Sequence, residues 1–199
     1  MRSCSRRVIR VASERATSCS RRSGGQPLIR RVAKEIALSA DVQVVVVTGY
    51  DRRSIERALS DLPLHFAHNA HWRAGMSSSI AVGIKGLPSK IEGVMIVPGD
   101  MPFLTASLIK TLIDTFDKNG RTSIIFPTTI AGEQRNPVLW PRRFFSQLKS
   151  LEPAGGKALL ARQSLETHAV KFDDEIVFHD VDTQEEMANV LVTISSGYR

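Results

Sequence analysis

The apolar positions of this chain follow two alternating periods, and each period predicts a different kind of element. Residues 42–47 and 94–97 are largely β-branched or apolar, and such runs suit strands that are buried on both faces of a parallel sheet. Residues 26–40 instead carry apolar side chains at the spacing of one helix face. The whole pattern predicts helices over residues 26–40, 54–62, 77–86, 105–119, 142–150, 156–162 and 184–192, and strands over residues 42–47, 64–67, 94–97, 123–126, 167–172 and 176–178.

Strands and helices alternate along the chain, and this order is typical of βαβ units. We therefore predict a mostly parallel sheet with helices on both faces, in one domain. Ser54 and Thr105 stand where they could cap the helices that begin there. In sheets of this kind ligands bind beyond the carboxyl ends of the strands. Residues that follow predicted strands are therefore the first candidates for chemistry.

The charge of the chain is concentrated at one end. The net charge is +7, and residues 1–24 hold seven arginines and one glutamate, which is +6, so the remaining 175 residues carry only +1. A basic stripe across the fold is therefore absent, and we expect no nucleic-acid partner. No apolar run reaches the ~20 residues that span a bilayer, so no membrane partner is expected. The two cysteines match no zinc, redox or disulfide pattern, and a cytoplasmic location is expected.

Asp100 is the sharpest candidate for chemistry. It follows the apolar run 94–97 in the sequence Pro98-Gly99-Asp100-Met101-Pro102, where an aspartate would project from the end of a strand. Mg²⁺ at phosphoryl-transfer sites is held by one or two carboxylates together with substrate phosphates. The alternative is that Asp100 occupies an ordinary turn or caps the next helix.

A second pair of carboxylates follows the predicted strand 176–178. Asp180 and Asp182 are two residues apart, so in an extended segment they point to opposite faces and only one would meet a metal. Asp182 or Thr183 could equally cap the helix predicted from residue 184.

Two polar loops complete the candidates. Residues 75–79, Gly-Met-Ser-Ser-Ser, bring small and hydroxyl side chains to a helix N-terminus, which suits a base, sugar or phosphate; a serine-capped helix start is the alternative. Arg135 and Asn136 lie in a loop between apolar segments, where the arginine could hold a phosphate or the loop could be a solvated hairpin. The five histidines show no metal-binding spacing, and Trp72 and Trp140 are expected to be packing residues.

The order of these motifs resembles that of the molybdenum cofactor nucleotidyltransferase family, and the triple serine is most similar to its cytidylyltransferase branch. The resemblance runs from about residue 24 to about residue 192. The motifs that carry it are Thr48-Gly49, Asn69 with Gly75-Met76-Ser77-Ser78-Ser79, Gly99-Asp100-Met101-Pro102, Arg135-Asn136-Pro137-Val138-Leu139 and Asp180-Val181-Asp182-Thr183.

The resemblance implies a Rossmann-like, three-layer α/β/α fold of the nucleotide-diphospho-sugar transferase type. It implies Mg²⁺-dependent transfer of CMP from CTP to molybdopterin-type molybdenum cofactor with release of pyrophosphate, and a molybdenum hydroxylase or its maturation factor as a further partner. The implied roles are Asp100 as catalytic residue and metal ligand, Asp182 as the second metal ligand, Gly49, Gly75, Ser77 and Ser78 in nucleotide binding, and Arg135 and Asn136 in substrate binding.

The N-terminus departs from the family, which begins with a strand and a phosphate-binding loop of the form L-A-A-G-x-S-x-R-x-G-x-x-K. This chain has no such loop and no lysine before Lys34. When residues 2–23 are given plausible codons and the reading frame is moved to start at the third base of each codon, one permitted translation is V-L-L-A-A-G-x-S-x-R-F-G-x-x-N-K-L-L-A-P-V-G. We therefore interpret residues 1–23 as an aberrant basic segment produced by a frameshift, and residues 24–199 as the nucleotidyltransferase domain. The serine-rich and acid-poor composition of this segment would otherwise favour a transit peptide. We prefer the frameshift because it also explains the arginines.

Three other functions remain open at this point. One is a guanylyltransferase, and another is a sugar-directed nucleotidyltransferase of the same fold. The third is a non-catalytic protein that binds the cofactor as a partner of a molybdenum hydroxylase, and the missing phosphate loop makes this last alternative relevant.

Overall fold

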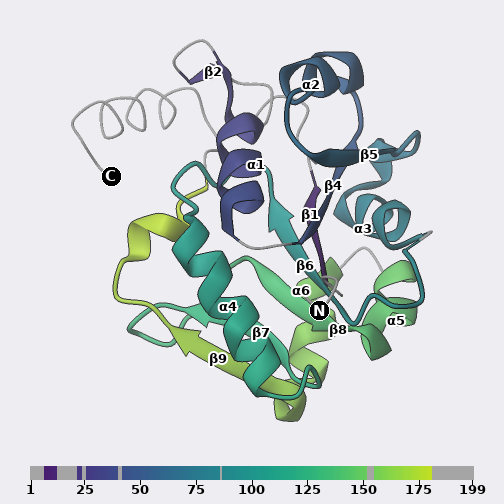
Figure 1. The fold of residues 1–199 in the computed structure, drawn as a ribbon. Coiled ribbons are helices and arrows are strands. Elements are labelled where there is room, and N and C mark those ends of the chain that lie inside the picture. The colour runs from purple at the N-terminus through teal and green to yellow at the C-terminus, as the bar shows by residue number, and fades with distance from the viewer. Residues whose placement is uncertain are drawn as a thin grey trace, which may run out of the picture.

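A seven-stranded sheet forms the centre of the protein (Figure 1). The computed structural model describes residues 7–12, 22–23, 26–39, 42–85, 87–151 and 155–180. The strand order is β5-β4-β1-β6-β8-β7-β9, and among these strands only β8 runs antiparallel to its neighbours. The strands of this sheet are β1 (Arg7–Ala12), β4 (Gln43–Thr48), β5 (Leu64–His68), β6 (Gly93–Pro98), β7 (Ile124–Thr128), β8 (Val138–Pro141) and β9 (Thr167–Lys171).

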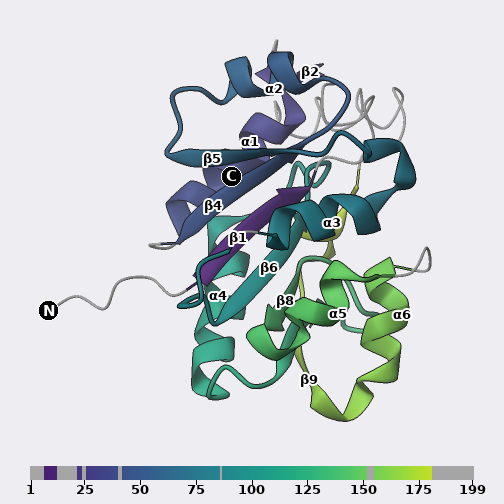
Figure 2. The same cartoon turned by 90° about the vertical axis from the view of Figure 1, so that its right-hand side faces the viewer.

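Helices cover both faces of the sheet (Figures 1 and 2), and each face has its own hydrophobic core. One core lies under α1 (Leu28–Ser39), α2 (Arg52–Ala58) and α4 (Ala106–Lys118). The other lies under α3 (Met76–Ile84), α5 (Phe145–Lys149) and α6 (Gly155–Arg162). The alternating side chains of β4 explain the division, because Val44 and Val46 join the first core while Val45 joins the second. The predicted three-layer, Rossmann-like α/β/α fold is confirmed.

Short elements complete the described part of the chain. They are the small antiparallel pair β2 (Arg22–Ser23) and β3 (Gln26–Pro27), and the 3₁₀ helices η1 (Trp72–Ala74), η2 (Arg142–Phe144), η3 (Ser164–Glu166) and η4 (Glu175–Phe178). None of the described helices has the length and apolar character that crossing a membrane requires.

Most of the predicted elements are present, but one predicted strand and one predicted cap are wrong, and two strands of the large sheet, β1 and β8, were not predicted. Residues 176–178 belong to η4 and not to a strand. The Asp174 side chain accepts a hydrogen bond from the Ile176 N–H (3.3 Å) and starts this turn, which buries Val177 and Phe178 against the first core. The apolar content of the segment therefore reflects packing of a turn, and a run of three residues could not distinguish the two structures.

The remaining differences are a cap and two unpredicted strands. β1 was not among the predicted strands, although it lies between β4 and β6. α2 begins after Asp51, before Ser54, so Ser54 lies inside the helix and does not cap it. β8 was not among the predicted strands, although it is fully buried between β6 and β7. Only four residues separate the loop before β8 from η2, which is too short a run for periodicity to identify. The helix predicted over residues 184–192 lies outside the described residues.

Candidate functional site

The predicted site residues gather at one edge of the sheet. β4, β1 and β6 are parallel neighbours, so Gly49 and Asp100, which follow β4 and β6, leave the sheet at the same edge. β8 runs antiparallel to β6 with Val138 beside Ile96, and therefore the loop with Arg135 and Asn136 enters at this edge as well. The fold thus brings together three of the motifs singled out in the sequence.

Helix α1 holds the segment that follows Asp100. The Arg31 Nε donates a 2.6 Å hydrogen bond to the carbonyl oxygen of Pro102. Four residues further along α1, the Glu35 Oε2 accepts a 3.0 Å hydrogen bond from the N–H of Ala106, at the start of α4. Thr105 caps the same helix as predicted, because its side chain accepts from the Leu108 N–H (3.2 Å). Asp100 itself is half-buried and sits on a turn. The residues that follow it are held to α1 by the hydrogen bonds at Pro102 and Ala106.

Asp100 suits a divalent cation whose other ligands come from substrate phosphates. No group of three or more His, Cys, Asp or Glu side chains that could hold a metal occurs among the described residues. Asp100 at a strand end matches the sparse protein ligation that Mg²⁺ uses when phosphates supply the remaining oxygens. Asp182 lies outside the described residues, while Asp180 is exposed at the rim of the cavity described below.

The loop before α3 is held in shape by its own hydrogen bonds. The Asn69 side chain is 1% exposed and donates to the Ser78 Oγ (2.8 Å) and the Ser79 Oγ (3.0 Å). The Ser78 hydroxyl lies 2.7 Å from the carbonyl oxygen of Gly75, to which it can donate. Gly75 has φ of +90°, a conformation that favours glycine. Ser77 and Ser78 are half-buried, so the loop presents a defined surface at the N-terminus of α3.

Gly49 has a packing role at this edge. A Cβ atom at Gly49 would lie 2.8 Å from the Cβ of Trp72, a separation that real Cβ atoms essentially never show. The Trp72 ring is half-buried, meets Tyr50 edge to face with centroids 5.5 Å apart, and lies 4.8 Å from the Arg73 guanidinium carbon. The glycine therefore allows the segment before α3 to approach the end of β4. Trp140, the other tryptophan, is 2% exposed within the second core, as expected of a packing residue.

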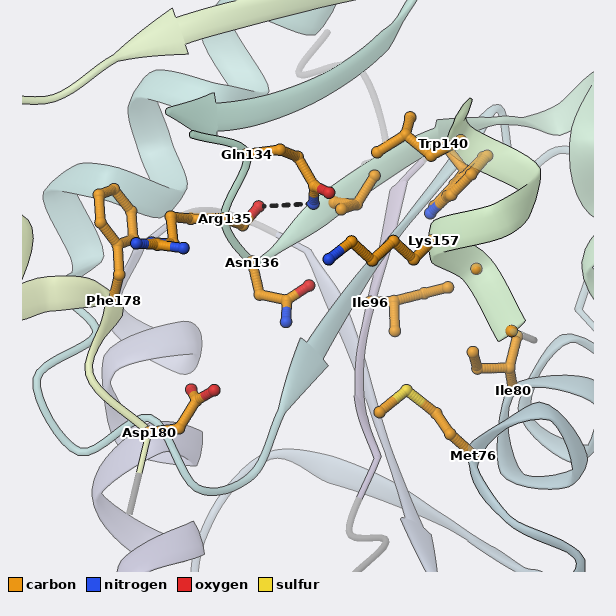
Figure 3. A pocket seen from close by; sticks show the side chains of 14 residues that line it. Met76, Ile80, Ile96, Gln134, Arg135, Asn136, Trp140, Lys157, Phe178 and Asp180 are labelled. Carbon is orange, nitrogen blue, oxygen red and sulfur yellow. Dashed lines mark hydrogen bonds between the residues drawn. The ribbon is translucent and has the colours of Figure 1, made fainter. Parts of the chain in front are cut away.

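A cavity of about 440 Å³ opens beside the start of α3, and Figure 3 shows it from close by. Its wall is apolar on the side of α3 and the sheet, and polar on the side of the loop before β8. Figure 3 shows the side chains of Asn136, Lys157 and Asp180 directed into it from three different elements. The lining residues are Met76, Ile80, Ile96, Gln134, Arg135, Asn136, Val138, Trp140, Gly155, Gly156, Lys157, Leu160, Phe178 and Asp180.

A second hollow of about 470 Å³ shares Arg135, Phe178 and Asp180 with this cavity. Arg135 forms an ion pair with the exposed Glu133, and its guanidinium remains partly exposed at the boundary of the two hollows. A ligand that extends from one to the other would pass this arginine.

Lys157 was missed in the sequence. It is exposed at the first turn of α6 and lines the cavity. Gly155 has φ of +70°, and the run Gly155-Gly156-Lys157 brings a cation to a helix N-terminus, a placement that a purely structural helix start does not favour. That conflict with the helix dipole is the signal that could have identified it.

Comparison with known proteins gives one family match and several distant relatives. The model of the MobA-like NTP transferase domain family matches residues 18–169. The chain is 30% identical over 89 residues to a probable molybdenum cofactor guanylyltransferase of Haloferax mediterranei, a match that covers 45% of this chain and 41% of that protein. It is 27% identical over 122 residues to the bifunctional protein GlmU of Picosynechococcus sp., covering 61% of this chain and 26% of that protein. Each match thus spans less than half the length of the curated relative.

Solved structures of similar fold match nearly the whole chain. A homologue of Mycobacterium tuberculosis Rv0371c from Mycobacterium sp. strain JC1 gives a TM-score of 0.77 at 19% identity, over 95% of this chain and 97% of that one. 4-Diphosphocytidyl-2C-methyl-D-erythritol synthase of Anaerococcus prevotii gives 0.76 at 13% identity, over 94% and 96%. Rv0371c of M. tuberculosis in complex with manganese gives 0.74 at 16% identity, over 94% and 98%. At such identities the likeness concerns the fold.

Proposed function

This chain belongs to the family of MobA-like NTP transferase domains, and from that premise we propose that it transfers CMP from CTP to a molybdopterin-type molybdenum cofactor and releases pyrophosphate. The observation that carries the proposal is the position of Met76. This residue begins α3 directly after the loop at Gly75, and its side chain also lines the 440 Å³ cavity. One helix start therefore separates a candidate nucleotide site from a candidate acceptor site.

The nucleotide is proposed to lie at the loop of Gly75, Ser77 and Ser78. Helix N-termini favour anionic or hydrogen-bonding ligands because their first N–H groups are free. The loop also stands at the carboxyl edge of parallel strands, where ligands of such folds bind. Gly49 contributes by letting Trp72 close against β4. Support for a pyrimidine comes from the resemblance of the triple serine to the cytidylyl branch.

The acceptor is proposed to occupy the cavity beside α3. Its apolar wall, which includes Ile80, Ile96 and Trp140, suits a flat ring system, while Asn136 can hydrogen-bond the polar edge of such a ring. Arg135 and Lys157 offer two cations for a phosphate at the rim. A phosphorylated pterin has both of these chemical features.

The reaction is a substitution at the α-phosphorus of the triphosphate. An oxygen of the acceptor phosphate forms the new P–O bond as the bond to the β-phosphate breaks, and pyrophosphate leaves with the electron pair. The residues of the site contribute mainly by positioning the two substrates and balancing their charge. Mg²⁺, for which Asp100 is the proposed ligand together with Asp182, would supply further charge stabilisation when bound.

Residues 1–23 are proposed to replace, through a frameshift, the segment that would hold the triphosphate. The match to the family begins at residue 18, after the stretch in which the shifted translation contains the glycine-rich loop. We call the protein in which residues 2–23 carry that shifted translation the restored protein. Residues 24–199 are identical in both.

Transfer of radiolabelled α-phosphate from CTP to purified molybdopterin cofactor, with release of pyrophosphate, tests the proposal in the restored protein. Transfer from GTP alone would assign the guanylyl activity that the printed name of the Haloferax relative carries. Transfer to a sugar phosphate would instead assign the sugar-directed alternative. Tight binding of the cofactor without any transfer would identify a non-catalytic partner and overturn the proposed activity.

A further inference from the structure

The carboxamide of Asn69 is buried and forms hydrogen bonds through both its nitrogen and its oxygen. It is 1% exposed, its Oδ1 accepts a 2.9 Å hydrogen bond from the N–H of His71, and its Nδ2 donates to the Ser78 Oγ (2.8 Å) and the Ser79 Oγ (3.0 Å). Both amide hydrogens and one acceptor position are therefore used. These partners lie at the two ends of the segment 70–79, so a single side chain joins the start of the segment to its end.

Asn69 is also tied to the sheet through its backbone. Its N–H donates a 2.8 Å hydrogen bond to the carbonyl oxygen of Thr48, the last residue of β4. The segment 70–79 is thereby fixed relative to the strand end at which Gly49 and Trp72 meet. Its geometry depends on one interior residue more than on the exposed side chains that would face a ligand.

The Ser78 hydroxyl is part of the same arrangement. It accepts from Asn69 and can donate to the carbonyl oxygen of Gly75 (2.7 Å) or of His71 (3.1 Å). Because a hydroxyl has a single hydrogen, Ser78 has none left to donate to a nucleobase while these contacts hold. Its effect on a nucleotide would therefore pass mainly through the shape of the loop.

We infer that Asn69 is a positioning residue for the nucleotide. It holds the 70–79 segment in the shape that receives the nucleoside, with Ser78 as its hydrogen-bond partner. The inference rests on the proposed function for the identity of the ligand. The shape of the segment itself can be followed separately, because Trp72 lies inside the segment and is half-buried, while Trp140 is 2% exposed.

Asn69→Ala removes all three side-chain contacts and is tested with two readouts. In the chain as it stands, acrylamide quenching of tryptophan fluorescence should rise about twofold, because Trp72 becomes more accessible. In the restored protein, KM for CTP should rise about tenfold, the size expected for losing a buried hydrogen-bonding group. The kcat should stay within about threefold, because the lost binding is shared by the ground state and the transition state. Ser78→Ala should have a similar effect, and the double variant should be little worse than either single variant.

Asn69→Asp supplies a pH-dependent test in a side chain of the same size. A carboxylate at this buried position could bond to Ser78 only if that hydroxyl gave up its donation to the carbonyl oxygen of Gly75 or His71. Burial would also raise the pKa of the introduced carboxyl. Protonation restores one donor, so the KM defect should shrink as the pH falls from about 8 to about 6, relative to the parent. Loss of packing alone would not follow pH in this way.

The matched control is Asn119→Ala. Asn119 is half-buried and donates a 2.9 Å hydrogen bond from its side chain to Thr115 at the end of α4, at the other end of that helix from the Asp100 turn. It should leave both readouts unchanged. Unchanged quenching in Asn69→Ala would overturn the structural part of the inference, and raised quenching with an unchanged KM would overturn the link to the nucleotide. If the restored parent transfers no nucleotide at all, the proposed function and that link fall together, while the quenching result still decides whether Asn69 holds the segment.

Discussion

The Glu35 carboxylate accepts a 3.0 Å hydrogen bond from the Ala106 N–H, so α1 provides a cap for a helix that lies 71 residues further along the chain. With the Arg31 contact to Pro102, this interaction brackets the segment directly after Asp100. α1 itself follows the segment in which the phosphate loop of the family is expected. One helix therefore connects two parts of the proposed site, and its polar face serves the site while its apolar face serves the core.

Glu35→Ala should lower the free energy of unfolding by about 1 kcal/mol. The change removes a charged acceptor from the first turn of α4, where both the unpaired N–H and the helix dipole favour an anion. Thr105 continues to cap the same helix through Leu108, which limits the loss. Urea denaturation of parent and variant measures the difference.

The control for that measurement is Glu56→Ala. Glu56 pairs with Arg52 along α2 at 2.8 Å, and exposed i,i+4 pairs contribute only about 0.3–0.5 kcal/mol. A Glu35 effect no larger than that of Glu56 would contradict the capping role.

Asp100→Ala in the restored protein should abolish Mg²⁺-dependent nucleotidyl transfer and leave the fold intact. The reason is that Asp100 is the proposed protein ligand at a position where Mg²⁺ has few others. Pyrophosphate release at increasing Mg²⁺ measures the activity, and far-UV circular dichroism checks the fold. Asp114→Ala, in the exposed Lys110–Asp114 pair on α4, should keep full activity. Retained turnover of Asp100→Ala at saturating Mg²⁺ would show that the aspartate only shapes the turn.

CTP should be preferred over GTP in kcat/KM by about tenfold or more, the range that pocket size and hydrogen bonding usually give. The small side chains of Ser77 and Ser78 resemble those of the cytidylyl branch. Steady-state kinetics with both nucleotides in the restored protein decide the question. Equal values, or a preference for GTP, would mean that the triple serine serves only as a helix start.

How far the sequence predicts this molecule depends on the length of the signal. The long apolar runs of β4 and β6 and the helical periodicity of α1 and α4 identify the layers, because each burial pattern extends over several residues. η4 and β8 span four residues each, and in so short a run tertiary packing decides between turn and strand. The meeting of Gly49 and Asp100 at one edge follows from the parallel order alone, whereas Asn136 joins them because the unpredicted β8 runs antiparallel to β6.

The parts of the site that were not predicted depend on side-chain geometry. The run Gly155-Gly156-Lys157 sets Lys157 apart in the sequence, but its place in the cavity wall follows only from the packing of α6 against α3. The engagement of Ser78 by Asn69 is likewise a matter of distances, and no spacing rule distinguishes a serine that contacts a ligand from one that supports its loop. The individual roles of the candidate residues therefore stay predictions until they are measured.

The Arg30–Asp61 ion pair should make stability depend on pH in the acid range. Arg30 donates two hydrogen bonds, of 2.5 and 2.7 Å, to the two carboxylate oxygens of Asp61. These bonds, followed by a backbone hydrogen bond, lower the pKa of Asp61 to about 2. Because the folded-state pKa lies below the unfolded value, near 4, the pair stabilises the fold above about pH 4, and this stabilisation is lost as the pH falls towards 2.

Asp61→Asn should accordingly lower Tm slightly at neutral pH, and the gap between parent and variant should close between about pH 4 and pH 2. The effect is small because Asp61 is 60% exposed. Thermal unfolding across this pH range measures the gap. A gap that stays constant down to pH 2 would show that the variant acts through something other than ionisation of Asp61.

The last prediction concerns β1, which occupies a central position in the sheet between β4 and β6. Its register places Arg10 opposite Val45 on one side and Ile96 on the other. A central strand is covered on both faces, so an arginine there must reach solvent or a carboxylate, and leaving its charge buried and unpaired would cost several kcal/mol. The shifted translation places V-L-L-A-A-G at residues 2–7, so the restored protein would take an apolar inner strand and the glycine turn after it from this earlier stretch.

The residues after β1 strengthen this contrast. Ser13 and Glu14 follow Ala12 where the family has glycine and later a lysine, and a glutamate would repel a triphosphate. The restored protein should therefore be more stable and bind CTP·Mg²⁺, whereas the chain as it stands should bind it poorly and turn over negligibly. Calorimetric titration of CTP into both proteins, alongside their thermal unfolding, makes the comparison. If the chain as it stands binds and reacts as well as the restored protein, residues 1–23 form a different, working loop, and the frameshift interpretation is wrong.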